Sequence, residues 1–244
     1  MKHDLHLDRL LKEWEFDPHT LSVRKVDLAD DRQVLQMRVD MGVLQLECEG
    51  RPDGEKPSGA ETYLDYLLHR QLESPDFQLN DSECTEVDRE FMQFYHRRIC
   101  WLRLQDYRRA VIDADHTLKL MQVAHTHSPD EEWSSSHEQY RPFVWFHRTQ
   151  AEALAELEEN GPEEAIEAVS KGLEEIRQIF LTHDVEEQFE SDELVVRLIE
   201  LRESLRKEYD VGQTLLEQLE DAVEKEQYER AAQLRDELAR RQAS

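Results

Sequence analysis

The chain has 244 residues, of which 35% are charged and 39% hydrophobic, and its formal net charge is −26. This length allows one large or two modest domains with a buried core, and the high charged fraction indicates that much of the chain forms helix surface. A surface this negative repels phosphate, which argues against direct binding to DNA or RNA. Two explanations remain for the acidic excess: solubility, which is the simpler one, and a basic partner.

The spacing of the cysteines and the length of the apolar segments argue against several classes of protein. Cys48, Cys84 and Cys100 are far apart and form no C-x-x-C pair, which argues against a zinc ribbon, a disulfide framework or a thioredoxin-type site. We expect reduced thiols in the core. Acidic residues interrupt the apolar residues of the N-terminal segment, and the chain has no run of about eighteen apolar residues. We therefore expect a cytoplasmic protein with no signal peptide and no contact with a membrane.

Residues 1–73 predict a head with a small antiparallel β unit and flanking helices. Apolar residues at helical spacing predict a short amphipathic helix over residues 3–14. Alternating apolar residues then predict one strand around Val23 and a second, half-buried strand over residues 35–41. The alternation changes phase at Gly42, which marks either a bulge or a tight turn into a further strand.

A loop bounded by Gly50 and Gly59 follows, with three glycines and two prolines in its ten residues. It lacks the Walker spacing and the G-x-G-x-x-G pattern of phosphate-binding loops, and Asp53 and Glu55 would repel a phosphate. A helix predicted over residues 60–71 could cover one face of the sheet. Residues 74–85 are rich in Asp, Ser and Asn and predict a linker between the head and a helical body.

Residues 86–210 predict this body, which consists of helical hairpins. The first hairpin turns near Asp106, and the second turns at Gly161, where Pro162 and the glutamates after it are helix-start signals. Small and apolar residues recur at the positions where two helices would pack, namely Trp101, Tyr107, Ala110, Ala114 and Leu118 in the first hairpin and Ala165 in the second.

This pattern resembles the tetratricopeptide (TPR) family, and the resemblance implies an array of helical hairpins with a concave face. The two units are further apart than the family period of about 34 residues, because residues 125–141 form a polar insertion. A helix predicted over residues 192–209 would close the array as a cap. The fold class that we predict is mainly α (α+β): a TPR-like array with a small N-terminal antiparallel β unit and a C-terminal helical hairpin.

The last segment, residues 213–244, predicts two short antiparallel helices that turn at residues 225–227. A hairpin this small leaves apolar area that must pack against the rest of the chain or against another molecule. The segment carries a spaced set of apolar, aromatic and charged residues: Leu219, Ala222, Tyr228, Glu229, Ala231, Ala232, Leu234, Arg235 and Asp236. This spacing is similar to that of the UVR motif, the interaction hairpin of UvrB and UvrC. The segment departs from the motif at Glu226, where an apolar residue is usual, and at Tyr228, where Phe is usual.

The resemblance implies a protein-docking device without a catalytic group, with a link to DNA-repair or stress-response complexes. We expect Tyr228 to anchor a partner, which is another UVR-type hairpin or a second copy of the chain. The apolar residues should stay partly exposed in the monomer, whereas Arg235 and Asp236 should fix orientation. The alternative is a generic hairpin that caps the helical array. The predicted protein-binding residues are Leu219, Tyr228, Glu229, Ala232, Leu234, Arg235 and Asp236.

The sequence contains few residues that could form a metal site or a catalytic site. His125, His127 and His137 lie with acidic residues in the polar insertion, but without a helical i,i+4 pair we expect solvated histidines and no metal. No Ser elbow, H-E-x-x-H or Walker loop occurs, and the many glutamates fit solvent-facing helix positions. We therefore expect no cofactor and a non-enzymatic protein-interaction adaptor. The alternative is a ligand-binding protein or hydrolase with its site at the loop between Gly50 and Gly59.

Overall fold

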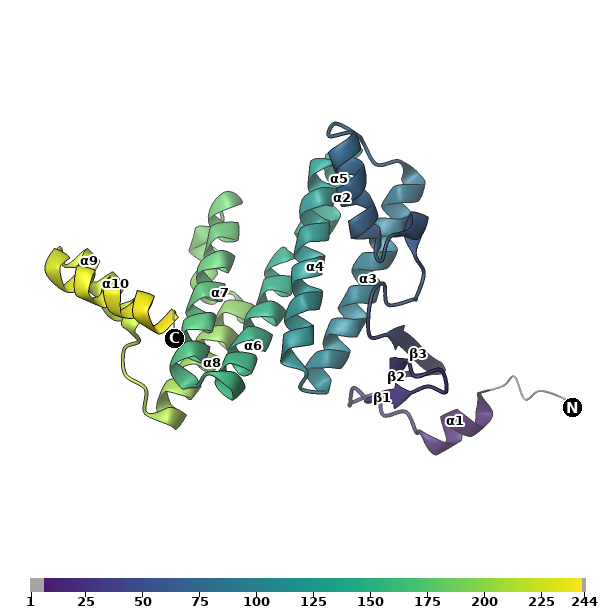
Figure 1. Cartoon of the computed structure of the whole chain (residues 1–244), viewed down its shortest axis with the longest axis horizontal. Helices are drawn as coiled ribbons and strands as arrows, with labels where there is room; N and C mark the ends of the chain where they lie inside the picture. Colours follow the sequence, from purple (N-terminus) through teal and green to yellow (C-terminus); the bar gives the residue numbers. More distant parts are fainter. Residues whose placement is uncertain (1–6, 243–244) are drawn as a thin grey trace, which may run out of the picture. The chain divides into compact units, whose positions relative to one another are not determined.

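The structure, a computed structural model, describes residues 7–242 of the chain. Contacts divide the chain into two compact units, Met1–Val144 and Trp145–Ser244. Helices dominate the described residues, and the first unit also contains one three-stranded antiparallel sheet (Figure 1). The predicted mainly α (α+β) class, with a small N-terminal β unit, is therefore confirmed.

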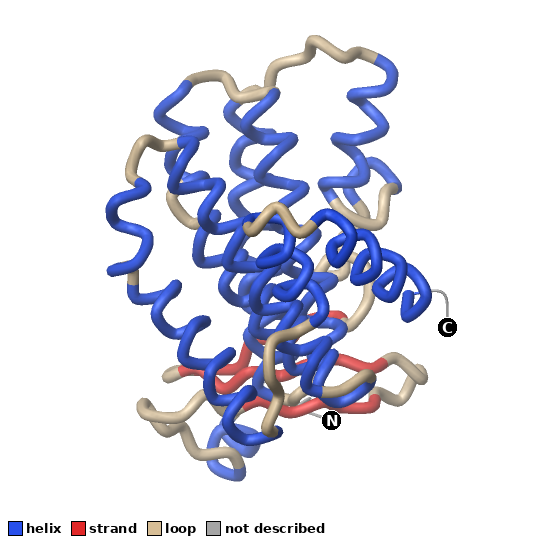
Figure 2. The backbone as a smooth tube through the Cα atoms, turned by 90° about the vertical axis from the view of Figure 1, so that its left-hand side faces the viewer, coloured by secondary structure: helices blue, strands red, loops and turns tan. Residues whose placement is uncertain are grey.

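The sheet has the order β1-β2-β3, with β1 at Val23–Asp27, β2 at Gln33–Val39 and β3 at Gly42–Glu47 (Figure 2). Both pairings are antiparallel, and Val39 pairs with Gly42. Only Asp40 and Met41 lie between these two strands, so the change of phase at Gly42 marks a tight turn and not a bulge. Met41 was expected in the strand but lies in the turn, 89% exposed.

Strand β2 is buried on both faces, so the prediction of a half-buried strand is wrong. Val34 and Leu35 point to opposite faces and are both fully buried. Arg38 is also buried, and its guanidinium donates to the carbonyls of Trp14 at 2.8 Å and Gly42 at 3.0 Å. These bonds join the end of α1 (Asp8–Glu13) to the β2–β3 turn. The first part of the helix predicted over residues 3–14 lies outside the described residues.

Helices α2 (Tyr63–Glu73), α3 (Asp81–Arg103) and α4 (Tyr107–Thr126) share the main core of the first unit. The buried face of α2 meets residues of α3 and α4, and α3 contacts β2. The prediction that the second helix covers the sheet is therefore wrong. Core residues of the three helices include Tyr63, Leu64, Leu67, Val87, Leu120 and Val123.

The segment over residues 74–85 belongs to this core, so the predicted linker is wrong. Phe77 and Leu79 are buried, and α3 starts within the segment. Asn80 caps α3, because its side chain accepts from the backbone of Glu83 while the Glu83 carboxylate accepts from the backbone of Asn80. The polar composition reflects this cap and not a flexible connection.

The insertion over residues 125–141 is also folded. It contains helix α5 (Glu131–Glu138), and His127 and His137 are buried. The His127 ring stacks on Phe77 with 3.8 Å between ring centroids, and its Nδ1 lies 2.9 Å from the Phe77 carbonyl oxygen. The expected solvated histidines are therefore wrong for these two. In the described part of the chain, no group of three or more His, Cys, Asp or Glu side chains is arranged to hold a metal ion.

Helix α6 (Arg141–Glu159) leads into the second unit, which continues with α7 (Pro162–Thr182), a 3-10 helix η2 (Glu186–Ser191) and α8 (Glu193–Tyr209). Gly161 precedes α7 with a φ of 118°, and Pro162 is its first residue, as the start signals predicted. Ala165 is fully buried here, and Ala110 is fully buried in the first unit. Helical hairpins therefore form at both predicted places, and the TPR-like array itself stays a prediction.

The chain ends in α9 (Leu215–Glu224) and α10 (Tyr228–Gln242), drawn in yellow in Figure 1. These two helices and the turn at residues 225–227 agree with the predicted hairpin. Within residues 7–242, no helix is both long enough and apolar enough to cross a membrane.

Candidate functional site

The terminal hairpin starts at a side-chain cap. Thr214 precedes α9, and its hydroxyl accepts from the Glu217 backbone at 3.3 Å while the Glu217 carboxylate accepts from the Thr214 backbone at 2.9 Å. Strong helix formers then alternate with apolar residues at helical spacing in both helices. The seam between α9 and α10 buries Leu215, Ala222, Ala231 and Leu234, and Leu219 and Leu238 pack against this cluster.

A specific backbone motif reverses the chain between the two helices. The Gln227 N–H donates to the Ala222 carbonyl at 2.7 Å, and the Glu226 N–H donates to the Val223 carbonyl at 3.0 Å. Glu226 has a φ of 55°, in the left-handed region. These are the features of a Schellman motif, which satisfies the last carbonyls of α9 and lets α10 start after only three residues.

The base of the hairpin is anchored to the helices before it. Arg206 of α8 donates to the Glu217 carboxylate and, at 2.5 Å, to the Gly212 carbonyl. Glu167 of α7 lies close to the backbone of Leu216 at the start of α9. Burial raises the pKa of Glu167, and Lys171 and the Leu216 backbone act in the opposite direction. A cavity of about 540 Å³ adjoins this contact, with lining residues from α7, η2, α8 and the start of α9.

The tip of the hairpin is open. Tyr228 is 69% exposed and Val223 is 54% exposed, one on each side of the turn. Tyr228 was expected at the surface, whereas Val223 was not among the predicted site residues. The signal for Val223 was its place in the apolar stripe just before the predicted turn. Leu219 and Ala232 are half-buried. Leu234 is 8% exposed, so the prediction that it stays open is wrong, because its side chain faces α9 in the seam.

One face of α10 carries most of the predicted binding residues. Tyr228, Ala232, Arg235 and Asp236 follow one another at helical spacing, which places them along the same side of the helix. Arg235 and Asp236 are exposed and pair with each other at 3.2 Å. Such an exposed pair contributes little to stability, so both groups remain available to a partner.

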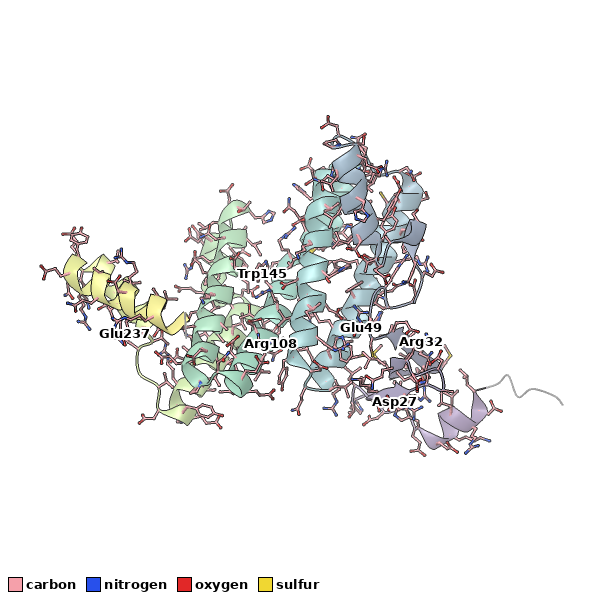
Figure 3. The ribbon with its side chains drawn as sticks, viewed as in Figure 1. Asp27, Arg32, Glu49, Arg108, Trp145 and Glu237 are labelled. Atoms are coloured by element: carbon pink, nitrogen blue, oxygen red, sulfur yellow. The ribbon has the colours of Figure 1, made fainter. Side chains whose placement is uncertain are left out.

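Two more acidic residues of α10 lie outside the closed seam. Glu229 follows Tyr228 and is exposed, as is Glu237, which is labelled on α10 in Figure 3. The structure therefore brings Tyr228, Ala232, Arg235 and Asp236 together, and it places Leu234 in the seam.

A second concave site lies at the loop between Gly50 and Gly59. It is a pocket of about 340 Å³, and Gly50 lines it together with residues from α2, α3 and α4. Its charged side chains bind the protein itself. Arg97 pairs with Asp113 at 2.7 Å and donates to the Gly50 carbonyl at 2.7 Å, and Arg109 pairs with Glu49 at 2.8 Å. The loop is held in place by these contacts.

The titratable groups at and next to this pocket also serve the fold. His116 lines the pocket and binds Glu90 at 2.8 Å. Glu90 is fully buried, although glutamates were expected at solvent-facing positions, and it caps the start of α2, because its carboxylate accepts from the backbone N–H groups of Tyr63 at 2.6 Å and Leu64 at 2.9 Å. Burial raises the pKa of the Cys48 thiol, which makes it a poor nucleophile. The geometry at this loop supports a structural role.

The cysteines agree with the expected core thiols. Cys48, Cys84 and Cys100 are free and buried. Burial raises the pKa of Cys84 and raises that of Cys100 to about 12. Each of the three is held in its protonated, unreactive form.

Comparison with known proteins gives one match, and it falls on the hairpin. Residues 213–243 match the family model of the UvrB/uvrC motif. No curated protein and no solved structure matches the chain. The match covers Thr214 at the cap, the closed seam and the open face of α10, and it agrees with the resemblance seen in the sequence.

Proposed function

We propose that the chain, whose residues 213–243 carry a UvrB/uvrC motif, is a non-enzymatic adaptor that docks a protein partner through this hairpin. The observation that carries the proposal is the 69% exposure of Tyr228 on a hairpin whose own seam is already closed. An aromatic ring that does not serve the core, at the tip of a motif associated with protein–protein interaction, fits a docking anchor.

The partner that suits this surface is another hairpin of the same kind, from a second protein or from a second copy of the chain. The open face of α10 offers the ring of Tyr228 and the small side chain of Ala232, which allows a second helix to approach closely. Arg235 and Asp236 follow on the same face and could pair with opposite charges on the partner, which would fix its orientation.

The rest of the chain has a supporting role in this proposal. The anchored base, in which Arg206 binds Glu217, presents the tip at a fixed place on the second unit. The helical hairpins would supply a second, TPR-like docking surface. The adaptor would act in the cytoplasm, in complexes linked to DNA repair or stress responses, without binding nucleic acid itself.

The proposal predicts that Tyr228→Ala abolishes partner capture without unfolding the protein. Truncation of an aromatic anchor at the centre of a small interface costs about 2 kcal/mol or more of binding free energy. The loss of folding stability should stay below about 0.5 kcal/mol, because the ring is mostly outside the core. Quantitative capture of partners by the tagged full chain, sedimentation for self-association and the melting temperature measure the two effects separately.

Two variants serve as controls. Tyr209→Ala removes a tyrosine that is 44% exposed at the end of α8, outside the hairpin, and should leave both binding and stability intact. Leu234→Ala opens the buried seam and should lower both together. If Tyr228→Ala behaves like Leu234→Ala, the hairpin is an internal cap. If Tyr228→Ala behaves like Tyr209→Ala, the docking surface lies elsewhere.

A further inference from the structure

The first unit contains a cavity that is unrelated to the docking residues of the hairpin. It measures about 620 Å³, and residues of α3, of α5 and of the start of α6 line it. Cavities of roughly 300–1,000 Å³ with mainly apolar walls are typical sites for small organic molecules. The apolar lining residues are Phe91, Met92, Tyr95, Tyr140, Phe143 and Val144.

Four aromatic rings form most of the wall. Phe91 and Tyr140 lie with 6.0 Å between ring centroids, and Tyr95 and Phe143 lie with 6.3 Å between theirs. The rings of each pair are tilted, by 50° and 45°, so they do not cover each other face to face. Tyr140 is 49% exposed and Met92 is 48% exposed, which places them at the mouth. A flat ring system in the cavity would gain contact on several sides.

The polar side chains at the α5 side of the cavity hydrogen-bond within the protein. His137 is bound on both ring nitrogens, since Nε2 lies 2.9 Å from the Asp88 carboxylate and Nδ1 lies 3.0 Å from the Trp133 carbonyl oxygen. The Ser136 hydroxyl donates to the same carbonyl at 2.6 Å. These bonds also hold the His137 ring in a T-shaped contact with Phe91, with 5.4 Å between centroids. This part of the wall is therefore formed before any ligand enters, which lowers the entropic cost of binding.

The buried cation of the cavity, Arg98, also serves the fold. It is 1% exposed and engaged within the protein, where its Nη1 donates to the Thr117 hydroxyl at 3.1 Å. The charged and polar side chains of the cavity thus stabilise the protein itself, and the surface left for a ligand is apolar. Moving an ion out of water into such a site costs much more than moving an uncharged group.

We propose that this cavity binds a small uncharged aromatic compound, with its rings between the Phe91–Tyr140 and Tyr95–Phe143 pairs. Its affinity comes from the burial of apolar area and from contacts between rings. A compound with the same rings and one charge makes the same contacts but loses the hydration of its charged group. The uncharged compound should therefore bind more tightly than either ion.

A matched series of ligands tests this order with the full-length chain. The fluorescent neutral compound N-phenyl-1-naphthylamine is the probe, and it should give saturable one-to-one binding. The competitors are neutral naphthalenemethanol, anionic naphthoate and cationic naphthylmethylammonium, all substituted at the same ring carbon. The alcohol should displace the probe at a concentration about tenfold lower than either ion, because only the ions lose the hydration of a charge.

The net charge of −26 would by itself weaken the anion and favour the cation, so the series is run at about 0.15 M and about 1 M salt. Long-range attraction and repulsion are largely screened at the higher concentration, and the alcohol should remain the best competitor at both. The proposal fails if the probe shows no saturable binding, or if either ion competes as well as the alcohol at about 1 M salt.

Variants at the mouth locate the site. Tyr140→Ala removes an aromatic wall and should weaken the probe about fivefold. Met92→Glu places a charge beside the bound rings and should weaken it about tenfold. Both positions are about half exposed, so the fold should tolerate the changes, and the melting temperature checks this. Leu72→Ala, at an 83% exposed position outside the cavity, is the control and should leave probe affinity unchanged. Probe affinity that is unchanged in both mouth variants would place the binding elsewhere and overturn the proposal.

Discussion

A single glycine lets two helices of the second unit pack closely against each other. Gly172 of α7 faces Thr149 of α6, and a Cβ added at Gly172 would lie 2.6 Å from the Thr149 Cβ and closer still to its Oγ1 and Cγ2. All of these separations are much shorter than van der Waals contact distances. The Thr149 hydroxyl is itself buried without a hydrogen-bond partner among the described residues. Close packing of α6 and α7 therefore requires glycine at position 172. The same packing buries the Thr149 hydroxyl without a hydrogen bond to any residue of that part of the chain.

Gly172→Ala should lower the free energy of unfolding by about 2 kcal/mol. Overpacking of a filled core costs about 1–3 kcal/mol, which outweighs the gain of up to about 1 kcal/mol from a better helix former. Chemical denaturation measures the difference. The double variant Gly172→Ala with Thr149→Ala should recover most of the loss, since it removes the overlapping atoms. Gly212→Ala is a matched control, because nothing lies within 4 Å of a Cβ at that position, and equal effects of the two alanines would contradict the packing argument.

The burial of individual charged residues could not be predicted from the sequence pattern. A run of glutamates on a helix predicts a solvated face, yet Glu90 is fully buried, where it caps α2 and binds His116. Arg51 is similarly buried, and its guanidinium reaches Glu86 at 2.7 Å. The partners of both residues lie far away in the sequence, so helical periodicity contains no signal for them. Only the fold brings them together.

Elements formed by local signals were predictable, and elements fixed by distant contacts were not. The start of α7 at Pro162 and the reversal between α9 and α10 follow from residues within a few positions of each other. The packing of residues 74–85 depends instead on the stack of Phe77 against His127, across about fifty residues of chain. For this reason the hairpin and the exposure of Tyr228 could be predicted from the sequence, whereas α5 and the burial of Leu234 could not.

The turn of the terminal hairpin is strained at one residue. Glu226 is in the left-handed region with a φ of 55°, at the position of the Schellman motif where glycine is usual. A non-glycine residue in this conformation costs roughly 1 kcal/mol. Glu226→Gly should therefore stabilise the hairpin by about 1 kcal/mol.

Hydrogen exchange of the α9 and α10 amides measures this effect, because the hairpin is a small part of the chain and the melting temperature reports on all of it. Protection should rise in both helices of the variant. Gln227→Gly is the control: residue 227 does not have a positive φ, so glycine there should leave protection equal or lower. Lower protection in Glu226→Gly would show that its side chain, and not its backbone conformation, determines the turn.

At the scale of the whole molecule, charge and motif point to different ligands. The UvrB/uvrC motif over residues 213–243 is associated with repair proteins, whose substrates are nucleic acids. The net charge of −26 opposes contact with such a polyanion. The two observations are compatible if the chain meets a repair or stress-response complex through a protein, with Tyr228 as the contact, and leaves nucleic acid to its partner.

This leads to the prediction that the isolated chain has negligible affinity for nucleic acid at physiological salt. Binding to DNA is driven by basic side chains that replace condensed counterions on the phosphates, and a chain with 30 Lys and Arg against 56 Asp and Glu has no excess of positive charge to do so. Many of its arginines are also bound within the fold, as Arg97 is by Asp113. Fluorescence anisotropy with labelled duplex and single-stranded DNA, at about 0.15 M and about 0.05 M salt, measures the affinity and its salt dependence. We expect no saturable binding at either concentration.

Tight binding that weakens steeply with salt would contradict the prediction, because it would reveal a local basic surface strong enough to overcome the net charge and to bind nucleic acid directly.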